Sequence, residues 1–65
     1  GAVAARAFYE AGYRSVPDVA CADAAAMLER VSEVNRTGGY FKAKLGVKDM
    51  QFCIDCAALL LRLSA

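Results

Sequence analysis

Apolar residues recur along this chain at spacings of three and four residues, the period of an α-helix that buries one face. The first such stretch covers residues 2–12. We expect Gly12 to end this helix, because glycine readily adopts the left-handed conformation that stops one. The expected core face of the helix holds Ala4, Ala5, Phe8 and Ala11.

Two further helices are predicted by residues that typically cap a helix start. Ser15 is expected to cap a short helix over residues 16–21, in which proline occupies the first turn. Asp23 is expected to cap a longer helix over residues 24–35. The expected core face of this longer helix holds Ala24, Met27, Leu28, Val31 and Val34.

Gly38 and Gly39 are expected to end that helix, and a loop over residues 37–46 then leads to a last helix over residues 47–63. No stretch alternates with the two-residue period of a strand. The expected fold is therefore all-α, a small bundle of about four helices that forms a single domain over residues 1–65. The core face of the last helix should hold Val47, Met50, Ile54, Ala57 and Leu61, with Cys53 and Leu60 beside them.

The composition favours a small helical domain with apolar surface to spare. Of the 65 residues, 58% are hydrophobic, and many of these are alanine. A domain of this size buries only about 60% of the surface that its unfolded chain exposes, so surplus apolar surface indicates a partner. The net charge of +1 is small for a nucleic-acid binder. No apolar run reaches the roughly 18 residues that span a bilayer.

The cysteines and the lack of histidine limit the chemistry of the chain. Three cysteines, an odd number, favour a reducing compartment such as the cytoplasm. Cys53 and Cys56 form one Cys-x-x-Cys pair, while a structural metal site wants four ligands and Cys21 would add only a third. We therefore expect them to pack as small apolar residues, with no metal or cofactor. Without histidine the usual base near neutral pH is missing, so we expect no catalytic residues and no enzymatic activity.

Several short motifs resemble the helix-hairpin-helix-like domains of unknown function found in bacterial proteins, often as tandem copies. The motifs are Ala11-Gly12-Tyr13, Glu33-Val34-Asn35, and Cys53-Ile54 with Ala57. The resemblance covers nearly the whole chain and implies helix-hairpin-helix-like (SAM-like) packing.

The chain departs from that family at its start. The first hairpin helix and its glycine are absent, and Gly1 falls where the second hairpin glycine would be. Because Gly1 is also not preceded by a methionine, we expect a fragment of a longer chain. In DNA-binding members the hairpin presents backbone N–H groups to a phosphate. The resemblance therefore implies the fold rather than an activity.

The stretch over residues 36–48 has two interpretations. Its cations and one aromatic residue could bind a nucleic-acid backbone without sequence preference, the cations contacting phosphates and the ring stacking on a base. These residues are Arg36, Lys42, Lys44, Lys48 and Tyr40. Alternatively, Tyr40 and Phe41 pin the loop onto the core while the lysines stay solvated, and we favour this second interpretation.

The last helix carries a second apolar line beside its core face. This line, which we call the stripe, runs at steps of four, three and four residues through Phe52, Cys56, Leu59 and Leu63. A helix that is apolar over most of its circumference is typically buried on two sides. Either the small domain needs all of it for its own core, or the stripe is an interface.

We favour the interface, and with it a non-catalytic interaction or oligomerisation module. The occupant would be a second copy, a neighbouring domain of a longer chain or another protein, and weak nucleic-acid binding is the alternative. Outside the core line of the first helix, Ala2, Val3 and Ala7 are expected to add further contact.

Overall fold

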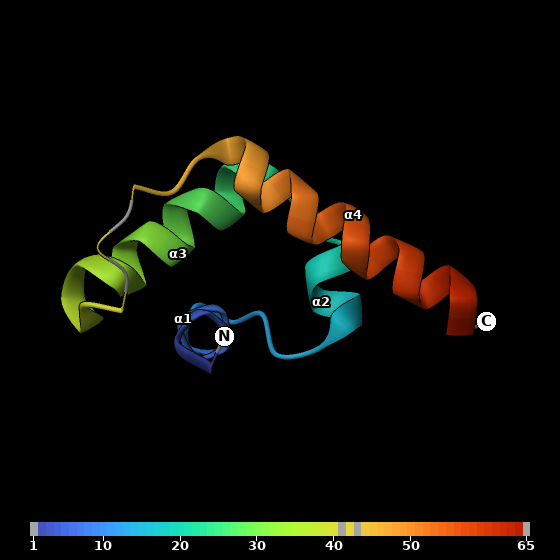
Figure 1. Cartoon of the computed structure of the whole chain (residues 1–65), viewed down its shortest axis with the longest axis horizontal. Helices are drawn as coiled ribbons and strands as arrows, with labels where there is room; N and C mark the ends of the chain where they lie inside the picture. Colours follow the sequence, from blue (N-terminus) through green and yellow to red (C-terminus); the bar gives the residue numbers. More distant parts are fainter. Residues whose placement is uncertain (1, 41, 43, 65) are drawn as a thin grey trace.

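The computed structural model describes residues 2–40, 42 and 44–64, and this part of the chain folds into four α-helices without a strand (Figure 1). The all-α fold expected from the sequence is therefore confirmed. The helices are α1 (Ala2–Glu10), α2 (Val16–Ala20), α3 (Ala24–Gly38) and α4 (Val47–Ser64).

The two predicted N-caps are present. The Ser15 hydroxyl accepts a hydrogen bond from the backbone N–H of Asp18 at 3.3 Å, at the start of α2. The Asp23 carboxylate accepts one from the N–H of Ala26 at 3.0 Å, at the start of α3. Each bond satisfies a donor that has no partner within its own helix, so these local contacts set where the helices begin.

Gly12 ends α1 through a Schellman motif. Its φ of +104° lies in the region that favours glycine. The N–H of Gly12 donates to the carbonyl of Tyr9 at 3.1 Å, and that of Tyr13 to the carbonyl of Phe8 at 2.9 Å. The rings of Phe8 and Tyr13 lie 6.4 Å apart and supply the apolar contact that accompanies such a motif.

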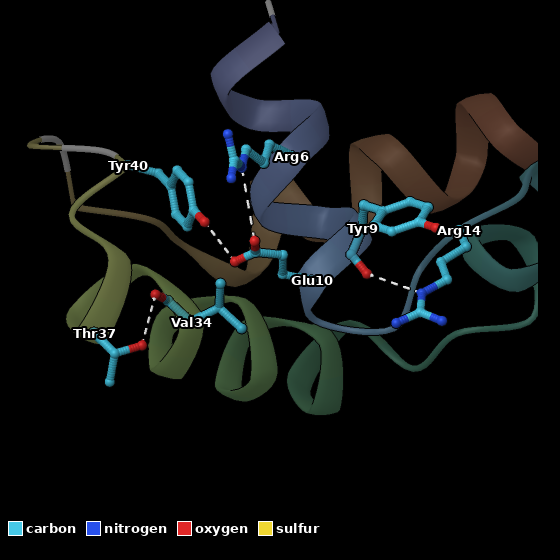
Figure 2. A network of polar contacts seen from close by, with 7 residues as sticks. All are labelled: Arg6, Tyr9, Glu10, Arg14, Val34, Thr37 and Tyr40. Atoms are coloured by element: carbon cyan, nitrogen blue, oxygen red, sulfur yellow. Dashed lines mark hydrogen bonds and ion pairs between the residues drawn. The ribbon is translucent and has the colours of Figure 1, made fainter.

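Helix α3 is longer than the sequence predicted. It includes Gly38 and ends only at Gly39, whose φ of +65° is left-handed and whose N–H donates to the carbonyl of Asn35 at 2.8 Å. The Thr37 hydroxyl also donates to the carbonyl of Val34 at 3.1 Å, which adds a bond to the last turn (Figure 2). A Cβ at Gly38 would collide with the ring of Tyr40, so a side chain at this position would force the Tyr40 ring to move.

The core lies between α3 and α4, and α1 and α2 close it from the side. Met27 and Val31 of α3 meet Met50 and Ile54 of α4 in one buried cluster. Helix α2 packs on α4 and α1 packs on α3. Helix α4 runs past α2, and its last turns extend beyond the other helices toward the C-terminus (Figure 1).

Three residues that we expected on or beside the core face of α4 are exposed instead. Val47 is 47% exposed at the first turn, while Leu60 and Leu61 are 53% and 37% exposed. The prediction for Leu60 is wrong because this residue lines an open groove between α1, α2 and α4. The prediction for Leu61 is wrong because the last turns of α4 extend beyond the other helices. The expected centre of this face is confirmed, since Met50, Ile54 and Ala57 are buried.

The buried face of α1 is rotated relative to the prediction. Ala7, which we placed outside the core line, is fully buried, whereas Ala5 is exposed. The inward residues are therefore Ala4, Ala7, Phe8 and Ala11, which follow the three-four spacing of a buried helix face. Ala7 consequently belongs to the core of the domain and offers no surface to a partner.

Candidate interaction surface

The four residues of the stripe lie along the outer side of α4. Phe52 is 69% exposed, Leu59 50% and Leu63 75%, and Cys56 is exposed as well. At 100° per residue, the stripe lies opposite the line of Met50, Ile54 and Ala57 that faces the core. The described part of the chain therefore leaves the stripe uncovered, and its own core does not use it.

The two flanks of the stripe differ in chemistry. One flank carries the exposed side chains of Lys48, Asp55 and Arg62, at intervals of seven residues. The Asp55 carboxylate accepts a hydrogen bond from the Gln51 side-chain amide at 2.9 Å, within the same helix. On the other flank, Leu60 is exposed and Cys53 is half-buried. The stripe thus has a charged side and an apolar side.

On the apolar side, a groove opens between α1, α2 and α4, with a volume of about 570 Å³. The Tyr9 ring is 55% exposed, and the Arg14 guanidinium carbon lies 4.8 Å above its centroid. Arg14 Nε also donates to the Tyr9 carbonyl at 3.3 Å, which fixes the side chain at the groove (Figure 2). The other lining residues are Ala4, Ala5, Phe8, Tyr13, Ser15, Val16, Val19, Cys53, Ala57 and Leu60.

This groove was not predicted from the sequence. Its signal was weak: an apolar pair on α2, Val16 and Val19, and an aromatic residue, Tyr9, that falls outside the core line of α1. A groove depends on how far apart three helices settle, and no local pattern encodes that distance.

The cations proposed for phosphate contact have different surroundings. The Arg36 guanidinium pairs with Glu33 on the same helix. Arg36 and Lys44 line one shallow hollow of about 410 Å³, whereas Lys48 lies at the charged flank of α4. Lys42 is exposed in the loop.

Tyr40 ties the loop to α1. Its hydroxyl donates to the Glu10 carboxylate, which also pairs with Arg6 at 3.6 Å (Figure 2). The hydrogen bond to Glu10 is the main cause that raises the pKa of Tyr40, because the phenolate could no longer donate it. Tyr40 therefore holds the loop to α1 by a polar contact at the surface rather than by packing on the core cluster, and Phe41 lies outside the described residues.

The two cysteines of the pair differ in burial, because Cys53 lies partly in the domain while Cys56 is exposed on the stripe. Cys53 is half-buried, and burial raises the pKa of its thiol, with smaller effects from Cys56 and Asp49. A raised pKa reduces the fraction of thiolate, the form that binds metal or reacts. Within residues 2–40, 42 and 44–64, no three cysteine or acidic side chains come close enough together to hold a metal ion.

We expect Cys53→Ala to lower the free energy of unfolding by about 1 kcal/mol through lost packing. Cys56→Ser should cost less, because that side chain is exposed. Urea unfolding of both variants, at concentrations low enough to suppress self-association, checks the order. One equivalent of zinc in protein purified without chelator, lost in either variant, would contradict a packing role.

No protein family, curated protein or solved structure matches this chain. In the part of the chain that the structure describes, every helix is too short or too polar to cross a membrane.

Proposed function

We propose that this chain is a non-catalytic interaction module that associates with a second copy of itself through the stripe. One observation carries the proposal: the outer side of α4 presents a continuous apolar line from Phe52 to Leu63, opposite the core face. Fully burying a phenylalanine or leucine side chain stabilises by roughly 1.5–3 kcal/mol. A domain of this size has a small free energy of unfolding, so covering the stripe would add substantially to its stability.

A second copy is the simplest occupant, because most soluble homo-oligomers are closed and symmetric. The lack of histidine supports a non-catalytic role. Arg36 and Lys44 line one hollow, but Arg36 is paired with Glu33 and Lys48 lies on the charged flank of α4, which gives less support to nucleic-acid binding. The resemblance of the short sequence motifs is the ground on which we include helix-hairpin-helix-like packing in the proposal. Three free thiols fit a reducing compartment such as the cytoplasm.

The molar mass of the unmodified chain in solution tests this proposal. Light scattering across a concentration series should show the mass rising from the 6.9 kDa of one chain toward about twice that value. The stripe is short, so we expect the dimer to dissociate on dilution. A mass that stays at one chain up to millimolar concentration would show that the stripe does not drive self-association.

A further inference from the structure

The spacing of the stripe is that of a coiled-coil seam. Steps of four, three and four residues correspond to alternating d and a positions over two heptads, the pattern by which two helices pack side by side. With Phe52 at d, Cys56 is a, Leu59 is d and Leu63 is a. Four such residues span about 17 Å of helix, which is enough for one line of contact between two copies of α4.

The flanks decide the orientation of the two helices. The charged side chains Lys48, Asp55 and Arg62 occupy g positions, and the e positions hold Cys53 and Leu60. In a parallel pair each g position meets an e position of the other helix. Asp55 would then lie beside an apolar partner flank without an opposite charge. In an antiparallel pair, g meets g and e meets e, so charged flank meets charged flank.

An antiparallel two-fold axis through the middle of the stripe also matches the charges. When the axis passes between Cys56 and Leu59, each Phe52 faces the partner's Leu63 and each Cys56 faces the partner's Leu59. Asp55 and the partner's Arg62 then lie on the same side, offset by two residues or about 3 Å along the axis. This offset is well within the reach of an arginine side chain, and the symmetry makes the pair occur twice.

We propose that two copies pack antiparallel along the stripe, with Asp55 of each copy paired with the partner's Arg62. This inference rests on the proposed self-association and adds its geometry. On the opposite flank, Leu60 meets the partner's Cys53, which continues the apolar contact toward the groove. The isologous arrangement covers the whole stripe of both copies and leaves no apolar end for a third chain.

Charge reversal tests the arrangement. Asp55→Arg or Arg62→Asp alone should raise the dissociation constant of the dimer about tenfold at low salt, because two attractive pairs become repulsive. The combined variant exchanges the charges and should restore the constant to within about threefold of the unmodified chain. Sedimentation equilibrium measures the dissociation constants of all three variants. The differences between these constants should shrink at high salt, because surface charges are screened.

Lys48→Glu is the matched control. It reverses a charge on the same flank of the same helix, but the two-fold axis places no residue of the partner's α4 opposite it, so the dissociation constant should hardly change. If neither single reversal changes the dissociation constant, the antiparallel arrangement is wrong, while self-association itself still holds. The antiparallel arrangement is also wrong if the combined variant does not regain the original dissociation constant although circular dichroism shows that it is folded. A chain that stays monomeric would overturn both proposals.

Discussion

We expect Phe52→Glu combined with Leu59→Lys to abolish self-association and to leave the helical fold intact. Both side chains are at least half exposed in the single chain, so the charges cost the monomer little. Because the dimer is symmetric, the two substitutions remove four apolar contacts across the interface and bury four charges there. The loss exceeds the roughly 1.5–3 kcal/mol of each apolar side chain, and every 1.4 kcal/mol changes the dissociation constant tenfold. We therefore expect more than a thousandfold weakening, which light scattering reports as a constant monomer mass.

Ala25→Lys combined with Ser32→Glu is the control for this experiment. Both positions are exposed on α3, away from the stripe, and the pair introduces the same two side chains with no change of net charge. The control should dimerise like the unmodified chain. If the stripe variant and the control associate equally, the stripe is not the interface.

Met27→Ala should leave most of the chain unfolded at room temperature. Met27 is fully buried in the cluster with Val31, Met50 and Ile54. Truncating a buried methionine to alanine costs about 2–5 kcal/mol, through lost burial and the cavity left behind. A domain of this size rarely has more than about 3–5 kcal/mol of stability in total. The effect is therefore comparable to the whole free energy of unfolding, and circular dichroism with urea unfolding measures it.

Met27→Leu is the control that distinguishes the effect of a cavity from the effect of any substitution at this position. Leucine nearly conserves the volume of methionine, so this change should cost less than about 1.5 kcal/mol and leave the chain folded. A Met27→Ala variant that is as stable as Met27→Leu would show that the cluster is not the centre of the core.

Local sequence signals predicted the four helices, with boundaries within a few residues of those observed. The hydrogen bonds of the caps at Ser15, Asp23 and Gly12 join groups three to five positions apart, so these caps can be recognised without knowing the fold. The buried cluster of α3 and α4 was likewise predicted by helical periodicity. So was the stripe, because its spacing of four, three and four is a property of α4 alone.

Which apolar residues are covered depends on how the helices pack against one another. Ala7 and Leu61 both carry apolar side chains on helices, yet one is buried and the other is 37% exposed. The difference arises because α1 packs on α3, while the end of α4 extends beyond α2. Where one helix stops relative to another depends on packing between segments distant in sequence. For the same reason the groove beside Tyr9 became visible only once three helices were in place.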